Sequence, residues 1–176
     1  MFIKATWLAW LQCRVPIFGD HVNNIVPNRL WVSDISTALD YSWLKTNGIT
    51  HIVSVTSFSA SEVCAYPKEF IYNVVFAHDN TESDLITHWP NTTAFIYDAI
   101  ENGGKVLVHC KFGRSRSVAT VAAYLIWANR ISPNEALNYI REHRLQASPN
   151  SFFVFQLYLW ALSYRQYGSC SRGAKL

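Results

Sequence analysis

The sequence predicts an α/β fold: a central, mostly parallel, twisted sheet with helices on both faces. Apolar strand-like runs alternate with helical patterns along the chain, which favours parallel strands joined by helices. The run 49–56 has apolar residues at 49, 52, 53 and 55, and we interpret it as a strand that is buried on both faces of a sheet. The chain has 176 residues, of which 50% are hydrophobic and 15% are charged. That is enough apolar material for the core of one domain.

The first half of the chain predicts three strands and one helix. Residues 29–32 form the first strand, and the Ser-Asp pair at 33–34 consists of residues that favour helix N-caps. A helical stripe follows, and Gly48 ends it in the manner of a helix C-terminus. The stripe consists of Ile35, Ala38, Leu39, Trp43 and Leu44. The second and third strands are 49–56 and 70–76, separated by a polar stretch.

The second half predicts one more strand and four helices. Residues 84–101 have a helical pattern, which the Asn-Gly-Gly sequence at 102–104 stops. The strand 105–109 and a buried helix over 117–129 come next. Two further helices begin with Ser-Pro pairs, which supply an N-cap and a proline at the first helical position. These pairs are 132–133 and 148–149.

Residues 109–117, His-Cys-Lys-Phe-Gly-Arg-Ser-Arg-Ser, have the most informative pattern in the chain. They connect a predicted strand to a predicted helix, so several backbone N–H groups and a helix N-terminus point at one small volume. Such a volume suits a tetrahedral oxyanion. Cys110 begins the loop, where the amides and the helix dipole favour a thiolate, the form that acts as a nucleophile. The segment therefore predicts a site of phosphoryl transfer.

Each residue of this segment has an expected role in catalysis or in binding the phosphate. Arg116 has a planar fork of donors that can hold two phosphoryl oxygens, and Ser117 can hydrogen-bond the sulfur and help it leave. Gly113 allows a close approach or torsions that a side chain would block. His109 points away from the pocket by strand alternation, so we expect it to orient the loop and not to act as the base. The residues that wrap the phosphate are Lys111, Phe112, Gly113, Arg114, Ser115 and Arg116.

The pattern His-Cys-x-x-Gly-x-x-Arg-Ser resembles the signature of the cysteine-based protein phosphatases, and its Ser-Arg-Ser ending resembles the dual-specificity branch. The resemblance runs from about residue 28 to residue 160: 29–34 and 48–55 are similar to that family's first two strands, and 148–157 to the start of its last helix. It implies a cysteine-phosphatase-like fold. It also implies hydrolysis of phosphotyrosine, phosphoserine and phosphothreonine in proteins through a phosphocysteine, and an orienting role for Asn150.

The same resemblance implies an aspartate that protonates the leaving oxygen, on a loop after the strand that precedes the long helix. Asp79 follows that strand directly, and we expect it to be the general acid and base. Asp84 is expected to cap the next helix, because aspartate is a good N-cap. Glu82 is expected to be solvated. His78 could donate a proton near neutral pH, but a loop histidine is more often simply exposed.

Substrate class is open at this point. Lys111 and Arg114 either point to solvent at the rim or widen the positive field for multiply phosphorylated substrates. Lipid phosphatases of the same superfamily have a lysine after the nucleophile, but usually also a Thr-Gly after the arginine, where this chain has Ser-Val at 117–118. A phosphoinositide or another non-protein phosphate is thus an alternative to a phosphoprotein. A non-catalytic phosphate-binding module would normally have lost Cys110 or Arg116.

Composition restricts cofactors and other partners. The net charge is +3, well short of the dense basic patches of nucleic-acid-binding proteins, so no nucleic acid is expected. The cysteines lack metal-ligand spacing, and a catalytic thiolate needs a reducing compartment. They are Cys13, Cys64, Cys110 and Cys170. The resemblance implies no metal or other cofactor, because the arginine and the loop amides supply the electrostatics. Nothing in the sequence indicates an oligomeric state.

We divide the chain into a segment 1–26 that packs on or extends the domain, a catalytic domain 27–165, and a flexible tail 166–176. The apolar stretch 1–11 is too short to span a bilayer, although its two tryptophans allow contact with a membrane surface. A cytoplasmic location follows from the need for a reduced thiol. The C-terminal Ala-Lys-Leu at 174–176 resembles a peroxisomal address, which is an alternative location.

Overall fold

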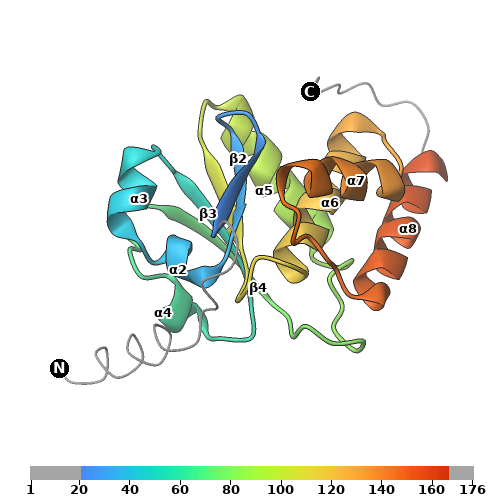
Figure 1. Cartoon of the computed structure of the whole chain (residues 1–176), viewed down its shortest axis with the longest axis horizontal. Helices are drawn as coiled ribbons and strands as arrows, with labels where there is room; N and C mark the ends of the chain where they lie inside the picture. The colour runs from blue at the N-terminus through green and yellow to red at the C-terminus, as the bar shows by residue number, and fades with distance from the viewer. Residues whose placement is uncertain (1–20, 167–176) are drawn as a thin grey trace.

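A computed structural model of the chain describes residues 21–166 as one sheet with helices on both sides (Figure 1). The strands are β1 (Val22–Val26), β2 (Leu30–Ser33), β3 (His51–Thr56), β4 (Ile71–Phe76) and β5 (Val106–His109). The helices are α2 (Ile35–Ala38), α3 (Tyr41–Thr46), α4 (Ala60–Val63), α5 (Trp89–Glu101), α6 (Arg116–Asn129), α7 (Pro133–His143) and α8 (Ser151–Gln166). The strand order is β1-β2-β5-β3-β4. Among the strand pairs of the described residues, only β1–β2 is antiparallel, and the mostly parallel sheet confirms the predicted α/β fold.

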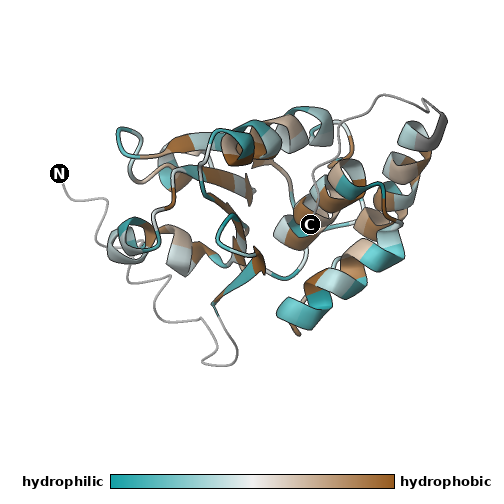
Figure 2. Cartoon of the chain, turned by 90° about the horizontal axis from the view of Figure 1, so that it is seen from above, coloured by the Kyte–Doolittle hydropathy of each residue, from teal (hydrophilic) through white to brown (hydrophobic). Residues whose placement is uncertain are grey.

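The sheet separates two hydrophobic clusters because successive strand residues point to opposite faces. On one face Trp31, Ile52 and Leu107 pack with Leu44 of α3. On the other face the alternate positions, such as Val32 and Val108, belong to the larger cluster that includes α5, α6, α7 and α8. Figure 2 shows the strands coloured largely as hydrophobic where they lie between the helices. The sheet is thus covered on both faces, as parallel sheets require.

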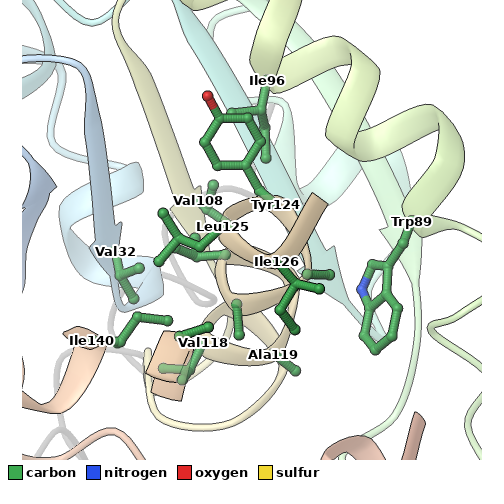
Figure 3. Packing of buried hydrophobic residues seen from close by; sticks show 14 of the residues in the cluster. Val32, Trp89, Ile96, Val108, Val118, Ala119, Tyr124, Leu125, Ile126 and Ile140 are labelled. Atoms are coloured by element: carbon green, nitrogen blue, oxygen red, sulfur yellow. The ribbon is translucent and has the colours of Figure 1, made fainter. Parts of the chain in front are cut away.

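Helix α6 is the centre of the larger cluster. Nearly all of its residues are buried, in agreement with the prediction of a buried helix. Figure 3 shows its side chains between Val108 of the sheet, Trp89 at the start of α5 and Ile140 of α7. Because α6 is enclosed along its length, its N-terminus is fixed at the carboxyl end of β5.

The predicted helix after the first strand is two short helices. Asp34 caps α2 by accepting a hydrogen bond from the Thr37 amide, as the sequence indicated. A second aspartate, Asp40, has extended backbone torsions and accepts from the amide of Trp43, which starts α3. A side chain that satisfies the amides of a new first turn interrupts the preceding helix there.

The predicted helix over 84–101 is wrong at its beginning, because α5 starts at Trp89. Asp84 does not cap α5: its carboxylate accepts from the amide of Thr87 in a turn that precedes the helix. The amides of Leu85 and Ile86 bond to a side chain of α8 rather than to helical carbonyls. These contacts with α8 hold residues 85 and 86 in the turn that precedes α5.

The described part of segment 1–26 contains a strand that the sequence analysis did not predict. Residues 22–26 form β1, an edge strand that extends the sheet, with a register irregularity between Asn24 and Val26. The N-terminal apolar stretch and the C-terminal tripeptide lie outside the described residues. No helix within residues 21–166 is long and apolar enough to cross a membrane.

Candidate active site

The candidate site lies at the carboxyl ends of two parallel strands, β5 and β4, which are separated in the sheet by β3. The loop 110–115 follows β5 and leads into α6, and the loop 77–88, which we call the acid loop, follows β4 and leads into α5. The carboxyl ends of parallel strands meet at one edge of a sheet, where α/β proteins usually bind ligands. Both sets of predicted catalytic residues therefore reach the same edge.

Cys110 lies at the bottom of this site. Its side chain is buried, and its Sγ is 3.2 Å from Oγ of Ser117, in the first turn of α6. The helix begins at Arg116, so the amides of its first turn and the positive end of its dipole are close to the sulfur. The structure thus brings Cys110 and Ser117 together as the sequence predicted.

Gly113 gives the loop its shape. It has a φ of 64°, in the left-handed region, and a Cβ there would lie 2.6 Å from the carbonyl carbon and oxygen of Ser33. Its own carbonyl accepts a hydrogen bond of 2.7 Å from Nε of Arg144, which is buried after the end of α7. Arg144 also donates to the side chain of Asn23 in β1. The loop is therefore held against both β1 and α7.

Arg116 connects the two loops. The residue is 5% exposed, and its Nη1 donates to the carbonyl of Ala77 at 3.1 Å. Its Nε is buried and makes no hydrogen bond within the described residues, while Oδ2 of Asp79 lies 3.9 Å away. A buried donor without a partner is costly, so this nitrogen is suited to bond an anion that enters the pocket.

Asp79 lies over the same pocket, and its carboxylate is about one-third exposed. Oδ1 accepts from the hydroxyl of Ser115 at 2.7 Å and from the amide of Asn150 at 2.9 Å. Asn150 is also the N-cap of α8, because its Oδ1 accepts from the Phe153 amide. The last helix therefore begins two residues later than its Ser-Pro pair indicated, and its cap contacts the predicted acid.

The other polar residues of the acid loop lie elsewhere. His78 is exposed and contacts the ring of Phe76 edge-on. Glu82 is exposed as well, and the carboxylate of Asp84 accepts from the Thr87 amide in the turn described above. Among the acidic side chains of this loop, Asp79 is the one that lines the pocket.

His109 points away from the pocket. The ring is buried, and Nε2 is 2.7 Å from Oγ of Ser54 in the neighbouring strand β3. Burial lowers the pKa of His109 to about 4, so the ring is neutral at physiological pH. A neutral ring bonded to the sheet matches the expected orienting role better than that of a base.

The rim of the pocket is aromatic and basic. Phe112 is 47% exposed, and the ammonium of Lys111 lies 5.2 Å from the centre of its ring. Arg114 is exposed, and its backbone carbonyl accepts from the amide of Ser148. The pocket has a volume of about 400 Å³. It is lined by Asp79, Cys110, Phe112, Arg114, Ser115, Ser148, Pro149 and Asn150.

Comparisons with known proteins agree with this geometry. The model of the dual specificity phosphatase catalytic domain matches residues 30–162, which include both loops. The chain belongs to the dual specificity phosphatases. Their reaction, hydrolysis of phosphate esters on tyrosine, serine and threonine in proteins, is the activity of this enzyme.

Similar proteins align with most of the length of this phosphatase. Dual specificity protein phosphatase 1B of Arabidopsis thaliana is 38% identical over 128 residues, which are 73% of this chain and 75% of that protein. Dual specificity protein phosphatase 22-B of Danio rerio is 34% identical, covering 79% of this chain and 73% of its own. The crystal structure of human tyrosine phosphatase-like serine/threonine/tyrosine-interacting protein has a TM-score of 0.76 at 32% identity, covering 82% of this chain and 97% of its own.

Sequence reasoning missed two polar residues that hold the site of this phosphatase. Arg144 was not singled out, because nothing in a polar helix end marks one arginine as buried. Gln156 was noted only as part of a resemblance, although its side chain bonds the acid loop. Within residues 21–166 no group of three or more His, Cys, Asp or Glu side chains could hold a metal ion.

Proposed function

We propose that this phosphatase works through a phosphocysteine on Cys110, with Asp79 as general acid and base and Arg116 as the phosphate-binding residue. The observation that supports this most strongly is that the carboxylate of Asp79, held by Ser115 and Asn150, lines the same pocket as the thiol of Cys110. Nucleophile and proton donor can therefore act on one phosphoryl group.

The reaction then has two steps. In the first, Sγ of Cys110 attacks phosphorus in line, the bond from phosphorus to the ester oxygen breaks, and Asp79 gives its proton to that oxygen. In the second, Asp79 takes a proton from water as the water oxygen attacks phosphorus and the S–P bond breaks. Inorganic phosphate leaves, and Ser117, 3.2 Å from the sulfur, stabilises the departing thiolate.

Arg116 supplies the charge that the transferring phosphoryl group needs. Its Nη1 is already bonded to Ala77, so Nε and the remaining guanidinium nitrogen are the donors for two phosphoryl oxygens. The amides at the start of α6 add further donors. Lys111 and Arg114 at the rim raise the positive potential at the pocket mouth, which favours anionic substrates.

The substrate of this site is a phosphorylated protein. Phosphoinositides are not favoured, because the similar curated proteins described above are protein phosphatases. The retention of Cys110 and Arg116 also argues against a purely phosphate-binding module. We place the enzyme in a reducing compartment, the cytoplasm, because the thiol must stay reduced. A panel of phosphotyrosine, phosphoserine and phosphothreonine peptides beside phosphoinositides tests the substrate class.

Replacing Asp79 by asparagine tests the acid. With a phosphotyrosine peptide, whose phenol needs a proton to leave, Asp79→Asn should lower kcat by roughly 10²–10⁴-fold. With an aryl phosphate whose phenol is strongly acidic, the loss should be much smaller because that phenol leaves as the anion.

Asp84→Asn is the matched control, because asparagine can keep the bond from the Thr87 amide and Asp84 does not line the pocket. It should leave both rates within a few-fold of wild type. Equal losses on the two substrates for Asp79→Asn would count against acid catalysis by this residue. A leaving-group-dependent loss for Asp84→Asn would transfer the role to that position.

A further inference from the structure

The acid loop, residues 77–88, places Asp79 beyond the last bonds of the sheet. The amide of Ala77 still bonds the carbonyl of Thr56, but Asp79 lies two residues further on. Bonds inside the loop give it a local shape: the hydroxyl of Ser83 accepts from the amide of His78, and the side chain of Asn80 accepts from the amide of Ser83. Local shape alone does not fix where the loop sits relative to the pocket.

Gln156, in the second turn of α8, supplies that attachment. Its Oε1 accepts from the amides of Leu85 and Ile86 at 2.8 and 2.9 Å, and its Nε2 donates to the carbonyl of Ser83 at 2.9 Å. The residue is 3% exposed, so these bonds are shielded from competing water. One amide thus satisfies three backbone groups of an irregular segment.

The same helix holds the other end of the loop. Asn150, the N-cap of α8, donates from Nδ2 to Oδ1 of Asp79 at 2.9 Å and to the carbonyl of Asn80 at 3.3 Å. Gln156 follows six residues later, which is about 9 Å further along the helix axis. Two attachments at this separation fix the direction of the loop as well as its position. Asn150 contacts the carboxylate itself, whereas Gln156 acts only through the backbone.

We propose that Gln156 is a positioning residue for acid catalysis, which holds the acid loop on α8 so that the carboxyl group of Asp79 meets the leaving oxygen. The inference rests on the proposed role of Asp79. It predicts that losing Gln156 damages the step in which a poor leaving group is protonated and spares the attack by Cys110. Arg116, which binds the carbonyl of Ala77, keeps the start of the loop in place in either case.

Two substitutions distinguish the hydrogen bonds that Gln156 accepts from the one that it donates. Gln156→Met has a similar length and removes all three bonds, and Gln156→Glu keeps an acceptor for the amides of Leu85 and Ile86 but loses the donor to Ser83. With a phosphotyrosine peptide, Gln156→Met should lower kcat on the order of 10- to 100-fold, since displacement by about 1 Å costs up to 10²-fold. Gln156→Glu should lose less. With an aryl phosphate of an acidic phenol, both should stay within about threefold of wild type.

Tyr158→Phe is the control on the same helix. It removes the exposed bond from the Tyr158 hydroxyl to Oδ1 of Asn134, far from the acid loop in sequence. It should leave kcat on both substrates unchanged. Thermal melts of every variant show whether the fold persists, and if Gln156→Met does not fold, Gln156→Glu alone decides the question.

A double variant separates this inference from the proposed function. Adding Gln156→Met to Asp79→Asn should cause no further loss that depends on the leaving group, because the acid is already absent. If Asp79→Asn shows the leaving-group dependence and the Gln156 variants slow both substrates equally or neither, Gln156 is not a positioning residue. If Asp79→Asn itself lacks the dependence, the proposed function fails first.

Discussion

Gly113→Ala tests whether the backbone of the catalytic loop is as tightly fitted as its geometry implies. Gly113 has a φ of 64°, where an alanine costs about 1–2 kcal/mol. In addition, the new Cβ would lie 2.6 Å from the carbonyl of Ser33 and from Nη2 of Arg144. Carbon contacts are normally about 3.5–4.0 Å, so the loop must move away by about 1 Å.

Gly103→Ala is the matched control. Gly103 has a similar φ of 76°, but a Cβ there would meet no atom within 4 Å. It should lose only the conformational term, about 1–2 kcal/mol of unfolding free energy, and keep full activity. Gly113→Ala should lose more stability and, because the amides and Cys110 shift together, on the order of 10²-fold in kcat/KM.

The two variants are compared by urea unfolding and by turnover of a phosphotyrosine peptide. Activity of Gly113→Ala within about threefold of wild type would refute the reasoning, because the loop would then tolerate the displacement. Equal stability losses in the two variants would show that the contact with Ser33 relaxes without cost.

Other predictions concern single side chains of the site. Arg116→Lys should lose about 10²–10³-fold in kcat/KM despite keeping the charge, because lysine lacks the planar fork, and activity near wild type would remove its assigned role. Ser117→Ala should slow breakdown of the phosphocysteine more than its formation, so that phenol is released in an initial burst. A time course of this variant without a burst would contradict the role of Ser117. Burial lowers the pKa of His109 to about 4. Between about pH 6.5 and 4 this ring therefore binds a proton in the unfolded chain but not in the folded one. Stability should therefore fall by about 3 kcal/mol as the pH drops through that window, and urea titrations should show a shallower fall for His109→Gln, whereas identical slopes would mean that the ring is not held neutral.

The parts of the site that were predictable are encoded locally. The strand, loop and helix around Cys110 occupy one continuous segment, so hydrophobic runs on either side of a polar stretch were enough to predict them. The aspartate caps show the limit of this reasoning. Asp34 was correctly expected to start a helix, but Asp40 divides the helical stripe, because a cap can compete with a periodic pattern that continues past it.

The parts that were not predictable depend on distant partners. The helical pattern predicted over 84–101 includes the end of the acid loop, yet Gln156, 71 residues after Leu85, binds the Leu85 amide and holds that end outside the helix. Arg144 is buried only because the carbonyl of Gly113 and the side chain of Asn23 surround it. Neither environment can be inferred from neighbouring residues, since tertiary contacts override local preference.

The most direct test of the central claim is to trap the phosphocysteine. The enzyme is quenched in acid during turnover of a phosphotyrosine peptide and digested, and the peptides are analysed by mass spectrometry. The account predicts a phosphoryl group on Cys110, present in wild type, more abundant in Ser117→Ala, and absent from Cys110→Ser, which should also be inactive while remaining folded. A phosphoryl group on another residue, or turnover by Cys110→Ser at the wild-type rate, would contradict it.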